Sequence, residues 1–575
     1  LWHTLSLHDA LPISETADPY HGDKSLKLVA SAGGYFRNHA SITMSPQYTY
    51  LVKFAAKKGA DYGSSSVDLR IFKSVGGVVN AYQTTVTGLT ESWQEFEVTF
   101  PGIENASGAW WVEFGFGAPG TVFFDNVEMH IQEYYDPASK FTTIGREILH
   151  DLDLAGIRWG AIGANYQSLS NCSGPYQTNT LTYADFVHLS NQMGGYALIC
   201  AGVHDGYYKN NDGEVVRNNS AITDWFSNEN TFSHFMEYMG GDGATEWGAK
   251  RIAEGYTQNL IEQSNTLVIE FGNEVWGSVA HGAHTFGSDY NYYTQWANDA
   301  AGNHVKASPY YNAEKVVTGI SARAPDADYG LHDKIFDNPN SNLDWFNLSG
   351  YMGGNMDYEP NVDPGKTIMD YHKNGYANFA AKVDGLISNR KRMLRETGRV
   401  WPYYFYEGNM TTQTYHGSLG QAITFGDYYA ESMKHGVAIP SVFCLEGGQW
   451  RLIDDLPSLR KRPMYHVTRM YNHLARGGVL LHSEVKSVDG IKTADGNEIH
   501  LESLGAHAYA DGENYTVVLF SRDFTRDYHA MVNLPDGIGT PSNGKKYILS
   551  GTDPSASQVS IDTLDVTVED NMIVR

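Results

Sequence analysis

The sequence has little cysteine, little positive charge and no long apolar run. Its 575 residues contain three cysteines, Cys172, Cys200 and Cys444, which have neither the C-x-x-C spacing of a zinc site nor the pattern of a disulfide framework. It has 41 Lys and Arg against 66 Asp and Glu, and the net charge of −25 disfavours nucleic-acid binding because phosphate contacts need clustered basic side chains. No apolar run approaches the roughly 20 residues that a membrane span requires. We therefore expect no metal, no cofactor, no nucleic-acid partner and no membrane span.

Aromatic residues, in contrast, are abundant at 13% of the chain, with 38 Tyr and 12 Trp. Flat rings of this kind stack on sugar faces, although they also build ordinary hydrophobic cores. The length of the chain favours about two to four domains. The composition therefore suits a carbohydrate-binding protein without establishing one.

The first 14 residues read LWHTLSLHDALPIS, a stretch too short and too polar for a signal peptide. Thr4–Ile13 resembles the translation of a common sequencing adapter. We therefore set residues 1–14 aside as a non-native segment and expect the native N-terminus to be missing. A lost signal peptide would make this a secreted or periplasmic protein, which is the location we expect.

Residues 15–135 show short alternating segments separated by Gly, Ser and Asn, the pattern of a β-sandwich. This stretch resembles the jelly-roll carbohydrate-binding modules attached to xylanases, cellulases and arabinofuranosidases, through W-x-x-F at Trp93–Phe96 and a closing FFDNVEM strand. Trp110 and Trp111 are adjacent in one strand, so their rings point to opposite faces. We expect one ring to enter the core and the other to meet sugar, unless the second ring packs under a loop. The predicted strands include Thr49–Lys57, Ser66–Ser74, Trp93–Phe100, Trp110–Gly117 and Thr121–Ile131.

Residues 136–477 alternate between helical and apolar strand-like segments, which predicts a parallel sheet and, at this length, a (β/α)8-type barrel. Residues 478–575 return to strand patterns and predict a C-terminal β-sandwich. The predicted barrel strands are Gly156–Gly163, Tyr196–Gly202, Thr266–Gly272, Asp328–Asp333, Trp345–Met352, Trp401–Glu407 and Ser441–Gly447. The predicted helices are Gly145–Leu154, Tyr183–Met193, Ala244–Tyr256, Ala313–Arg323, Ala377–Arg390 and Tyr465–Ala475.

Two of these strands end in carboxylates, Glu274 in LVIEFGNEVWG and Glu407 in YYFYEGN. Barrel enzymes carry their catalytic groups at the carboxyl ends of the strands. Glycoside hydrolysis with retention needs two carboxyl groups about 5 Å apart across the scissile bond. The tripeptide GNE is a weak signal by itself, because it recurs at Gly496–Glu498 in what reads as a hairpin turn. Glu446 also closes a predicted strand and is a rival to Glu407.

Strand–Asn–Glu resembles the acid/base motif of the clan of barrel glycosidases that holds its two catalytic Glu residues on strands four and seven. Within that clan the chain is most similar to the α-L-arabinofuranosidases, through Met236–Tyr256, which contains W-G-x-x-R, and through Arg462–Leu481, the last barrel helix. One helix and then a sandwich follow Glu446, so its strand is the eighth and that of Glu407 the seventh. The resemblance therefore implies that Glu274 is the general acid/base and Glu407 the nucleophile of a retaining hydrolase.

The same resemblance implies how other side chains meet the substrate. Asn273 would bond the hydroxyl next to the reacting carbon, and Asn165 would line the same subsite. Arg158 would lie under the nucleophile and hold it ionised. The further candidates for sugar contact are Trp450 as a stacking wall, Tyr351 and His204.

Two departures from the family pattern bear on the sugar. Ala161–Asn165 reads AIGAN where the family has Gly-Gly-Asn, and Ser349–Tyr351 reads SGY where the family has His-x-Tyr. We expect a retaining hydrolase of plant or algal cell-wall polysaccharide, with that polysaccharide or its oligosaccharides as partner. The alternatives are an endo-acting β-glucanase or agarase of the same clan, or a non-catalytic polysaccharide-binding protein.

Counting back from Glu274 gives only three strands, although the motif places this residue after the fourth. In some arabinofuranosidases a sugar-binding module is inserted between the first and second barrel strands. We therefore expect a barrel that lacks its first strand, with poor stability because two sheet edges stay unpaired. The alternative is that His130–Tyr135 supplies the missing strand.

Overall fold

The computed structural model divides into two units, each compact by itself. The first comprises Leu1–Ile148, Asn171–Asp185 and Ala253–Tyr256, and the second comprises Leu149–Ser170, Phe186–Ile252 and Thr257–Arg575. The structure describes the chain outside residues 1–5, 21–24, 38–43, 75–77, 103–109, 137–138, 160–168, 170–180, 202–206, 210–214, 218–229, 275–289, 325–333, 335–340, 353–366, 411–415, 456–457, 487, 493–497, 534–543, 570–571 and 575.

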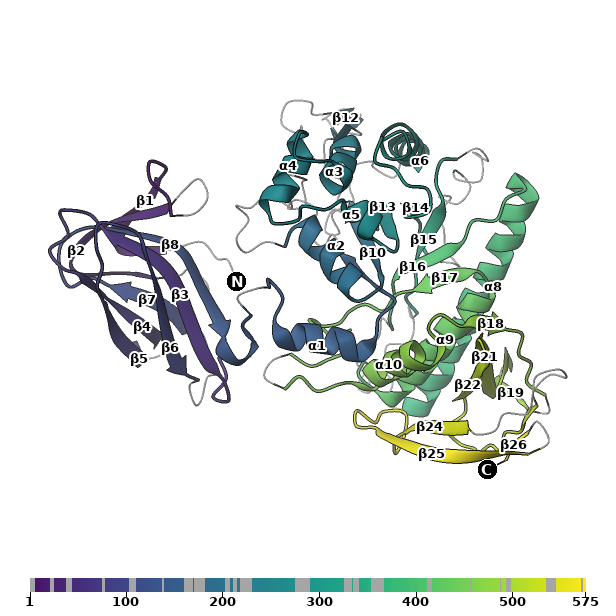
Figure 1. Cartoon of the computed structure of the whole chain (residues 1–575). Helices are drawn as coiled ribbons and strands as arrows, with labels where there is room; N and C mark the ends of the chain where they lie inside the picture. Colours follow the sequence, from purple (N-terminus) through teal and green to yellow (C-terminus); the bar gives the residue numbers. More distant parts are fainter. Residues whose placement is uncertain are drawn as a thin grey trace. The chain divides into compact units, whose positions relative to one another are not determined.

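The first unit is the predicted β-sandwich (Figure 1). Its strands follow the order β5-β4-β7-β2-β8-β3-β6, and β1 pairs with β2. Strand β2 pairs with β8 through Leu26–Ala30 and with β7 through Tyr35–Arg37, so it passes from one layer to the other. The strands are β1 Ser6–Glu15, β2 Ser25–Arg37, β3 Thr49–Lys58, β4 Ser66–Ser74, β5 Val78–Thr87, β6 Gln94–Pro101, β7 Trp110–Gly115 and β8 Gly120–Ile131.

Period-two alternation explains the core of this sandwich. Leu69 and Ile71 on β4 and Val112 and Phe114 on β7 are buried in one cluster with residues of β3 and β8. The intervening side chains lie on the other face of the sheet. The sequence prediction excludes residues 1–14, whereas Ser6–Glu15 form strand β1, paired antiparallel with β2. Pairing at the edge of a sheet is made by backbone N–H and C=O groups and depends little on which side chains the added strand carries.

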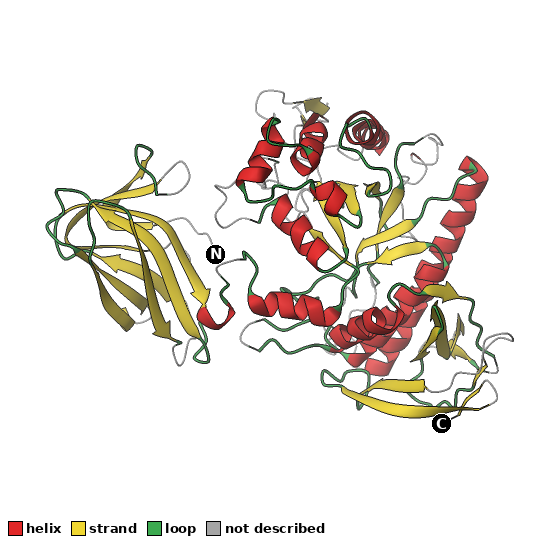
Figure 2. Ribbon diagram, in the orientation of Figure 1, coloured by secondary structure: helices red, strands yellow, loops and turns green. Residues whose placement is uncertain are grey.

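The second unit contains a sheet of seven parallel strands, in the order β17-β16-β15-β14-β13-β10-β9, with helices around it (Figures 1 and 2). Strands β13 and β16 are buried along their whole length, as expected of a parallel sheet covered on both faces. The strands are β9 Gly156–Trp159, β10 Tyr196–Ala201, β13 Leu267–Phe271, β14 Val316–Ser321, β15 Trp345–Ser349, β16 Tyr403–Glu407 and β17 Val437–Pro440. The helices are α2 Tyr183–Gln192, α3 Asn230–Gly240, α4 Glu246–Ala253, α5 Leu260–Gln263, α6 Tyr290–Asp299, α8 Ile368–Thr397, α9 Leu419–Lys434 and α10 Pro463–Ala475.

Two predicted elements of this barrel are wrong. The predicted helix Ala313–Arg323 is in fact strand β14, because VVTGIS is rich in β-branched residues and fully flanked by strands. The predicted eighth strand, Ser441–Gly447, is instead a loop, and the strand β17 precedes it at Val437–Pro440. Glu446 is exposed in this loop. The predicted strand Asp328–Asp333 lies outside the described residues.

The sheet has two edge strands, β9 and β17, and no pairing between them occurs in the part of the chain that the structure describes. Residues up to Ile131 belong to β8 of the sandwich, and Gln132–Tyr134 form a short 3-10 helix, η1. Helix α1, Thr143–Leu152, follows. His130–Tyr135 therefore supplies no barrel strand, and the expected seven-strand barrel is confirmed for the described residues.

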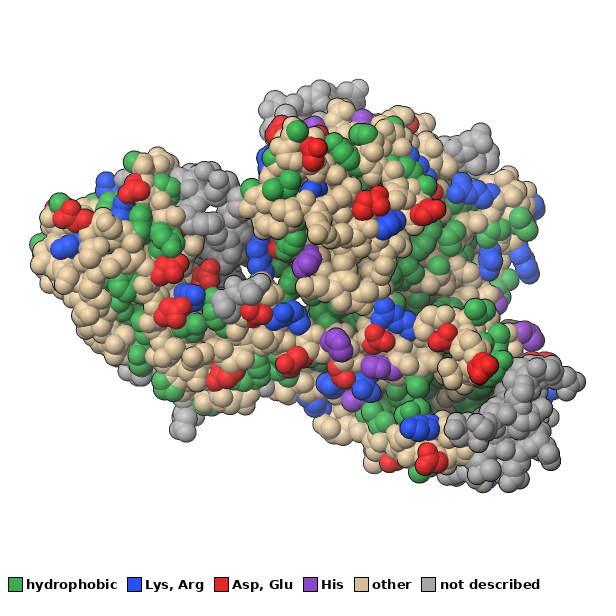
Figure 3. All heavy atoms as spheres, viewed as in Figure 1, with side chains coloured by type: hydrophobic (Ala, Val, Ile, Leu, Met, Phe, Trp, Pro, Cys, Tyr) green, Lys and Arg blue, Asp and Glu red, His purple; other side chains and the backbone are tan. Residues whose placement is uncertain are grey.

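The C-terminal region is a β-sandwich, as predicted. Strand β21 pairs with β18 and β22, and β25 pairs with β24 and β26. Figure 3 shows acidic and basic side chains interspersed over the visible face of the molecule. No helix in the described parts of the chain has the length and apolar character needed to cross a membrane. The strands are β18 Val479–Leu481, β19 Gly490–Lys492, β20 Glu498–Glu502, β21 Leu504–Asp511, β22 Asn514–Ser521, β23 Val532–Asn533, β24 Gly544–Ser550, β25 Ser560–Glu569 and β26 Met572–Val574.

A buried ion network joins helix α9 to this C-terminal sandwich. Asp427 accepts hydrogen bonds from Arg522 Nε at 2.5 Å, from Arg522 Nη2 at 3.0 Å and from His507 Nε2 at 2.8 Å. All three side chains are almost completely buried. Although burial alone raises the pKa of Asp427, the Arg522 charge and these bonds lower it to about 2.

We expect Asp427→Asn to destabilise the second unit by about 3–5 kcal/mol, because it leaves the buried Arg522 guanidinium without its counter-charge. Calorimetric melting at pH 7 measures the loss. The exposed pair of Asp489 with Arg526 provides the control, and Asp489→Asn should leave the Tm unchanged. Since the pKa of Asp427 is depressed, its contribution is complete above about pH 4 and is lost as the pH falls through 2. Equal Tm values for the two variants would contradict this role.

Candidate active site

The Arg158 side chain on β9 connects three strands of the barrel. Its Nε donates to Glu270 Oε2 at 2.8 Å, its Nη1 to Glu407 Oε2 at 3.2 Å and its Nη2 to Asn273 Oδ1 at 2.8 Å. The guanidinium carbon lies 4.6 Å from the ring centroid of Tyr406. Parallel neighbouring strands end at one edge of a sheet, so residues far apart in sequence meet there. The arrangement gathers two carboxylates and one amide on a single buried cation.

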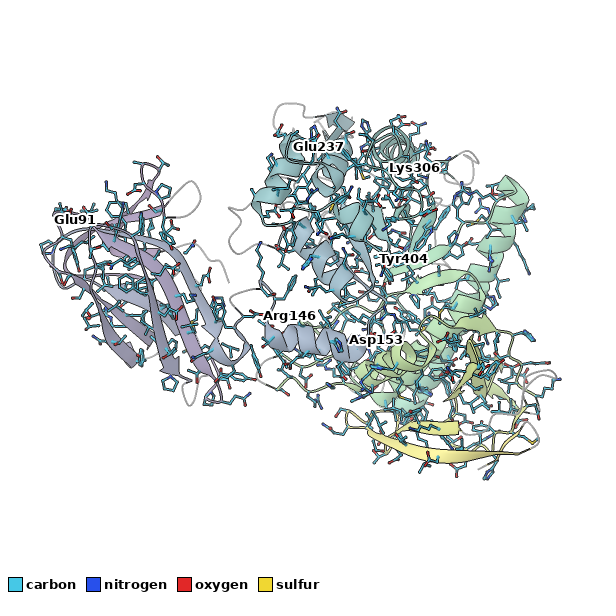
Figure 4. The ribbon with its side chains drawn as sticks, viewed as in Figure 1. Glu91, Arg146, Asp153, Glu237, Lys306 and Tyr404 are labelled. Atoms are coloured by element: carbon cyan, nitrogen blue, oxygen red, sulfur yellow. The ribbon has the colours of Figure 1, made fainter. Side chains whose placement is uncertain are left out.

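Alternation along β16 determines which of its residues enter the barrel. Tyr404 and Tyr406 cluster with Leu198 of β10 and Val268 of β13 in the barrel interior. Figure 4 labels Tyr404 among the central strands. The Tyr404 hydroxyl lies 3.3 Å from Ser441 Oγ, just beyond β17. Glu407 is the last residue of this strand and directly follows Tyr406.

Glu407 is 8% exposed and has a pKa raised to about 7. Burial is the largest cause of this rise, and the charges of Glu274 and Glu270 add to it, while Arg158 acts in the opposite direction. Arg158 thus favours the carboxylate, but burial outweighs its effect on the pKa of Glu407. A group with this pKa can be ionised for nucleophilic attack and still change protonation near neutral pH.

Glu274 follows β13 through a short turn. Gly272 has a φ of 80° and Glu274 a φ of 46°, both in the left-handed region. Non-glycine residues rarely adopt this conformation, and those that do concentrate at functional sites. The charge of Glu274 raises the pKa of Glu407, Tyr351 and Tyr406, so its carboxylate lies within electrostatic reach of all three.

Three half-buried aromatic rings stand beside Glu407. Tyr351 lies 6.5 Å from Phe443 and 6.3 Å from Trp450, and the last two rings are 5.8 Å apart, all measured between centroids. The charge of Glu407 helps to raise the pKa of Tyr351, after burial. The ring planes are inclined by 60° between Tyr351 and Phe443, by 70° between Tyr351 and Trp450 and by 58° between Phe443 and Trp450, so the rings pack largely edge to face. We call Tyr351, Phe443 and Trp450 the aromatic wall.

Asn409, two residues beyond Glu407, holds this wall in place. Its Nδ2 donates to the carbonyl oxygens of Phe443 at 2.6 Å and Trp450 at 3.0 Å. Its Oδ1 accepts from the backbone N–H of Met410 at 2.7 Å and from the Gln421 amide. The side chain is fully buried. Asn409 therefore ties the end of β16 to both ends of the loop that follows β17.

The structure brings together six of the side chains predicted from sequence. Asn165 and His204 lie outside the described residues. Glu446, the rival nucleophile, is exposed in the loop between Phe443 and Trp450. Glu270 and Asn409 were not predicted from the sequence: each lies within four residues of a predicted catalytic Glu, but their contacts are long-range. The six residues that gather are Arg158, Asn273, Glu274, Tyr351, Glu407 and Trp450.

The first unit presents an outward face with mixed aromatic and charged side chains on β2, β4 and β7. Trp111 is half-buried and stacks on Phe72, with centroids 5.5 Å apart, and the Arg37 guanidinium lies 5.6 Å from both rings. Arg70 pairs with the buried Glu113 on the same face. Trp111 is thus outside the sandwich core, while the Trp110 side chain is not among those described. We call this set the outer sheet face.

No family model matches the chain, and no curated protein matches it either. Several solved structures match it in fold. A family 51 α-L-arabinofuranosidase with bound arabinose is 13% identical, with 98% of this chain and 88% of that chain covered and a TM-score of 0.65. The family 51 α-L-arabinofuranosidase of Bifidobacterium longum is 14% identical, with 76% and 90% covered and a TM-score of 0.59. The Thermotoga maritima α-L-arabinofuranosidase in its arabinose complex is 14% identical, with 76% and 89% covered and a TM-score of 0.56. The chain therefore has the fold of the α-L-arabinofuranosidases, which confirms the fold that its motifs imply.

Proposed function

We propose that the protein is a retaining glycoside hydrolase of plant or algal cell-wall polysaccharide, similar in activity to the α-L-arabinofuranosidases. One observation carries the proposal: Arg158 bonds both Asn273 and Glu407, with the charge of Glu274 close by, at the ends of β13 and β16. This is the pairing of strand ends that the clan uses for its two catalytic carboxylates. The fold shared with arabinofuranosidases supports the same conclusion.

In the proposed first step, Glu407 attacks the anomeric carbon while Glu274 gives its proton to the leaving oxygen. A covalent glycosyl-enzyme forms on Glu407, and the leaving group departs as an alcohol. In the second step, Glu274 takes a proton from water, which attacks the same carbon and releases Glu407. Asn273, oriented by Arg158, is placed to bond the hydroxyl beside the reacting carbon. Two inversions at one carbon retain its configuration.

Activity on nitrophenyl glycosides and intact polysaccharides tests the proposal. Release of nitrophenol from an α-L-arabinofuranoside, with arabinose as the product from polysaccharide, would support an exo-acting arabinofuranosidase. Internal cleavage of a β-glucan or agarose would identify the endo-acting alternative. Inactivity on every member of both panels would overturn the proposed function and leave a polysaccharide-binding protein.

We also propose that the outer sheet face of the first unit binds glycan. Trp111 provides a half-buried ring there, supported from below by the buried ring of Phe72, and Arg37 and Arg70 provide hydrogen-bond donors for hydroxyl groups. The adjacent buried carboxylate of Glu113 is held by Arg70, so the polar groups are fixed in position. This mixture of flat apolar surface and oriented donors is what a sugar chain needs.

We expect Trp111→Ala in the full chain to weaken glycan binding by roughly tenfold or more, because it removes the largest ring of this face. Affinity electrophoresis through gels that contain soluble glycans measures the effect. Phe123 is a half-buried ring on β8, in the other layer of the sandwich, so Phe123→Ala is the matched control and should migrate as wild type. Equal retardation of wild type and Trp111→Ala would make the outer sheet face a purely structural surface.

A further inference from the structure

A third carboxylate, Glu270, lies inside the barrel and has no part in the proposed reaction. It is on β13, four residues before Glu274, and is completely buried. Burying an ionised carboxylate is costly unless a cation or several donors accompany it. Its Oε2 accepts from Arg158 Nε at 2.8 Å. The same cation that contacts Glu407 therefore also serves Glu270.

The shape of the guanidinium gives Glu270 control over the other two contacts. This group is planar and its five N–H bonds point in fixed directions, so a bond at Nε determines where Nη1 and Nη2 point. Here Nη1 reaches Glu407 at 3.2 Å and Nη2 reaches Asn273 at 2.8 Å. The Tyr406 ring lies 4.6 Å from the guanidinium carbon and limits its rotation. Of these three acceptors, only Glu270 bonds the Nε atom of Arg158, so its loss would remove the bond that fixes the orientation of the guanidinium.

Charge gives Glu270 a second effect on the site. Two carboxylates, Glu270 and Glu407, share the single positive charge of Arg158 in a cluster that is almost fully buried. Burial raises the pKa of Glu270 itself, whereas the charge of Arg158 and hydrogen bonds from Arg158 and Asn347 lower it. In its ionised form, Glu270 offsets part of the attraction that Arg158 exerts on Glu407. The charge of Glu270 is one of the causes that raise the pKa of Glu407, after burial and alongside Glu274.

We propose that Glu270 is a positioning residue: its carboxylate orients Arg158 toward Asn273 and Glu407 together, and its charge competes with Glu407 for that cation. This proposal rests on the proposed function, in which Glu407 is the nucleophile. It adds that the pH range in which Glu407 is ionised depends on a residue that never touches the substrate.

The other titratable groups around the cluster come from five elements of the barrel. Burial raises the pKa of Tyr351, Tyr404, Tyr406 and Tyr293, and that of Cys444 to about 11. These groups are therefore neutral between pH 5 and 8. Cys200, on β10, is a buried thiol. The charges that act most strongly on the pKa of Glu407 are those of Arg158, Glu274 and Glu270.

Two variants separate the charge of Glu270 from its positioning role. Glu270→Gln removes the charge and keeps an oxygen that can accept from Arg158 Nε, whereas Glu270→Met removes both and keeps the length of the side chain. Removing one partner of a buried ion pair is destabilising. Arg158 keeps its contact with Glu407 in both variants, so we expect both to fold, with a lower Tm than wild type. Asp344→Asn is the matched control, because Asp344 is a carboxylate of the same barrel that pairs with Lys306 and not with Arg158.

The first readout is kcat/KM against pH on the best aryl glycoside. In wild type the acidic limb should have its midpoint near pH 7, where Glu407 becomes ionised. Both Glu270 variants should move this limb to lower pH by about one unit, because Arg158 then acts on Glu407 alone. The plateau should stay within about threefold of wild type in Glu270→Gln. It should fall by roughly 10- to 100-fold in Glu270→Met, where Arg158 is no longer oriented. Asp344→Asn should follow the wild-type profile.

The second readout is the Tm against pH, which requires no activity. The pKa of Glu407 is higher in the folded protein than in the unfolded chain, so the folded state binds its proton more tightly, and stability declines as the pH rises from about 4.5 to 7. The variants lower this pKa and also remove the titration of Glu270, whose own pKa is raised by burial, so their Tm relative to wild type should increase over that interval. If wild type cleaves no glycoside at all, the proposed function fails, and this readout still tests Glu270.

Superimposed pH profiles of wild type and folded Glu270→Gln, in both readouts, would overturn the proposal. A uniform loss of activity at every pH would do the same, since a merely structural role predicts that result. Failure of both variants to fold would assign Glu270 to barrel stability alone and would also reject it.

Discussion

Glu407→Gln is expected to abolish turnover, with kcat reduced by roughly 10⁴-fold or more, the scale seen when a covalent nucleophile is removed. The amide cannot form the glycosyl ester, and Arg158 keeps an oxygen acceptor at Nη1, so the site should stay assembled. Steady-state rates on the aryl glycoside that wild type cleaves best, with circular dichroism as a check of folding, measure the effect.

The matched control for this variant is Glu446→Gln. Glu446 is exposed in the loop that follows the barrel strand β17. Its substitution should leave kcat within about twofold of wild type, as surface changes away from the site usually do. Full activity in Glu407→Gln together with loss in Glu446→Gln would reverse the assignment of the nucleophile.

Glu274→Ala is expected to divide substrates according to their leaving groups. Glycosides of acidic phenols need no protonation and should keep most of their glycosylation rate, whereas natural linkages should lose about 10²- to 10⁴-fold. Azide should restore turnover of the activated substrates, because it attacks the glycosyl-enzyme without a general base. The product should be a glycosyl azide of retained configuration, identified by NMR.

The control for azide rescue is the Glu407→Gln variant, in which no glycosyl-enzyme forms and azide should have no effect. An azide product of inverted configuration from Glu274→Ala would mean that azide attacks the substrate directly. It would also place Glu274, rather than Glu407, in the position of a nucleophile. An equal loss on all leaving groups would remove Glu274 from the acid role.

The strands that hold the site were predictable because their patterns are strong. LVIEF is apolar except for Glu270, YYFYE is aromatic up to its final residue Glu407, and both are fully buried strands. The helix predicted over Ala313–Arg323 was wrong because a short apolar segment carries little periodicity, and tertiary pairing with β13 and β15 decided it. The loop after β17 was predicted as a strand because SVFCLEG is largely apolar, although the backbone carbonyl of Phe443 in it accepts a hydrogen bond from the Asn409 amide.

The candidate site was harder to predict than the strands. A motif identifies the residue that it contains, so Asn273 and Glu274 were visible in sequence, and Glu407 followed from counting strands. Glu270 and Asn409 act through contacts with Arg158 and with the loop after β17, which are 112 and 34 to 41 residues away along the chain. Such contacts depend on how the strand ends meet, and no local pattern encodes that meeting. The two carbonyls held by Asn409 illustrate why positioning residues escape a reading of sequence alone.

Trapping of the glycosyl-enzyme tests the central claim most directly. The protein is incubated with an activated 2-deoxy-2-fluoro derivative of the sugar that it hydrolyses, because fluorine slows both steps and a good leaving group restores the first. Peptide mass spectrometry then locates the added sugar. We expect one adduct per chain, on the carboxyl group of Glu407, and none in Glu407→Gln. A label on Glu446 or Glu270, or continued turnover with no adduct and an inverted product, would contradict it.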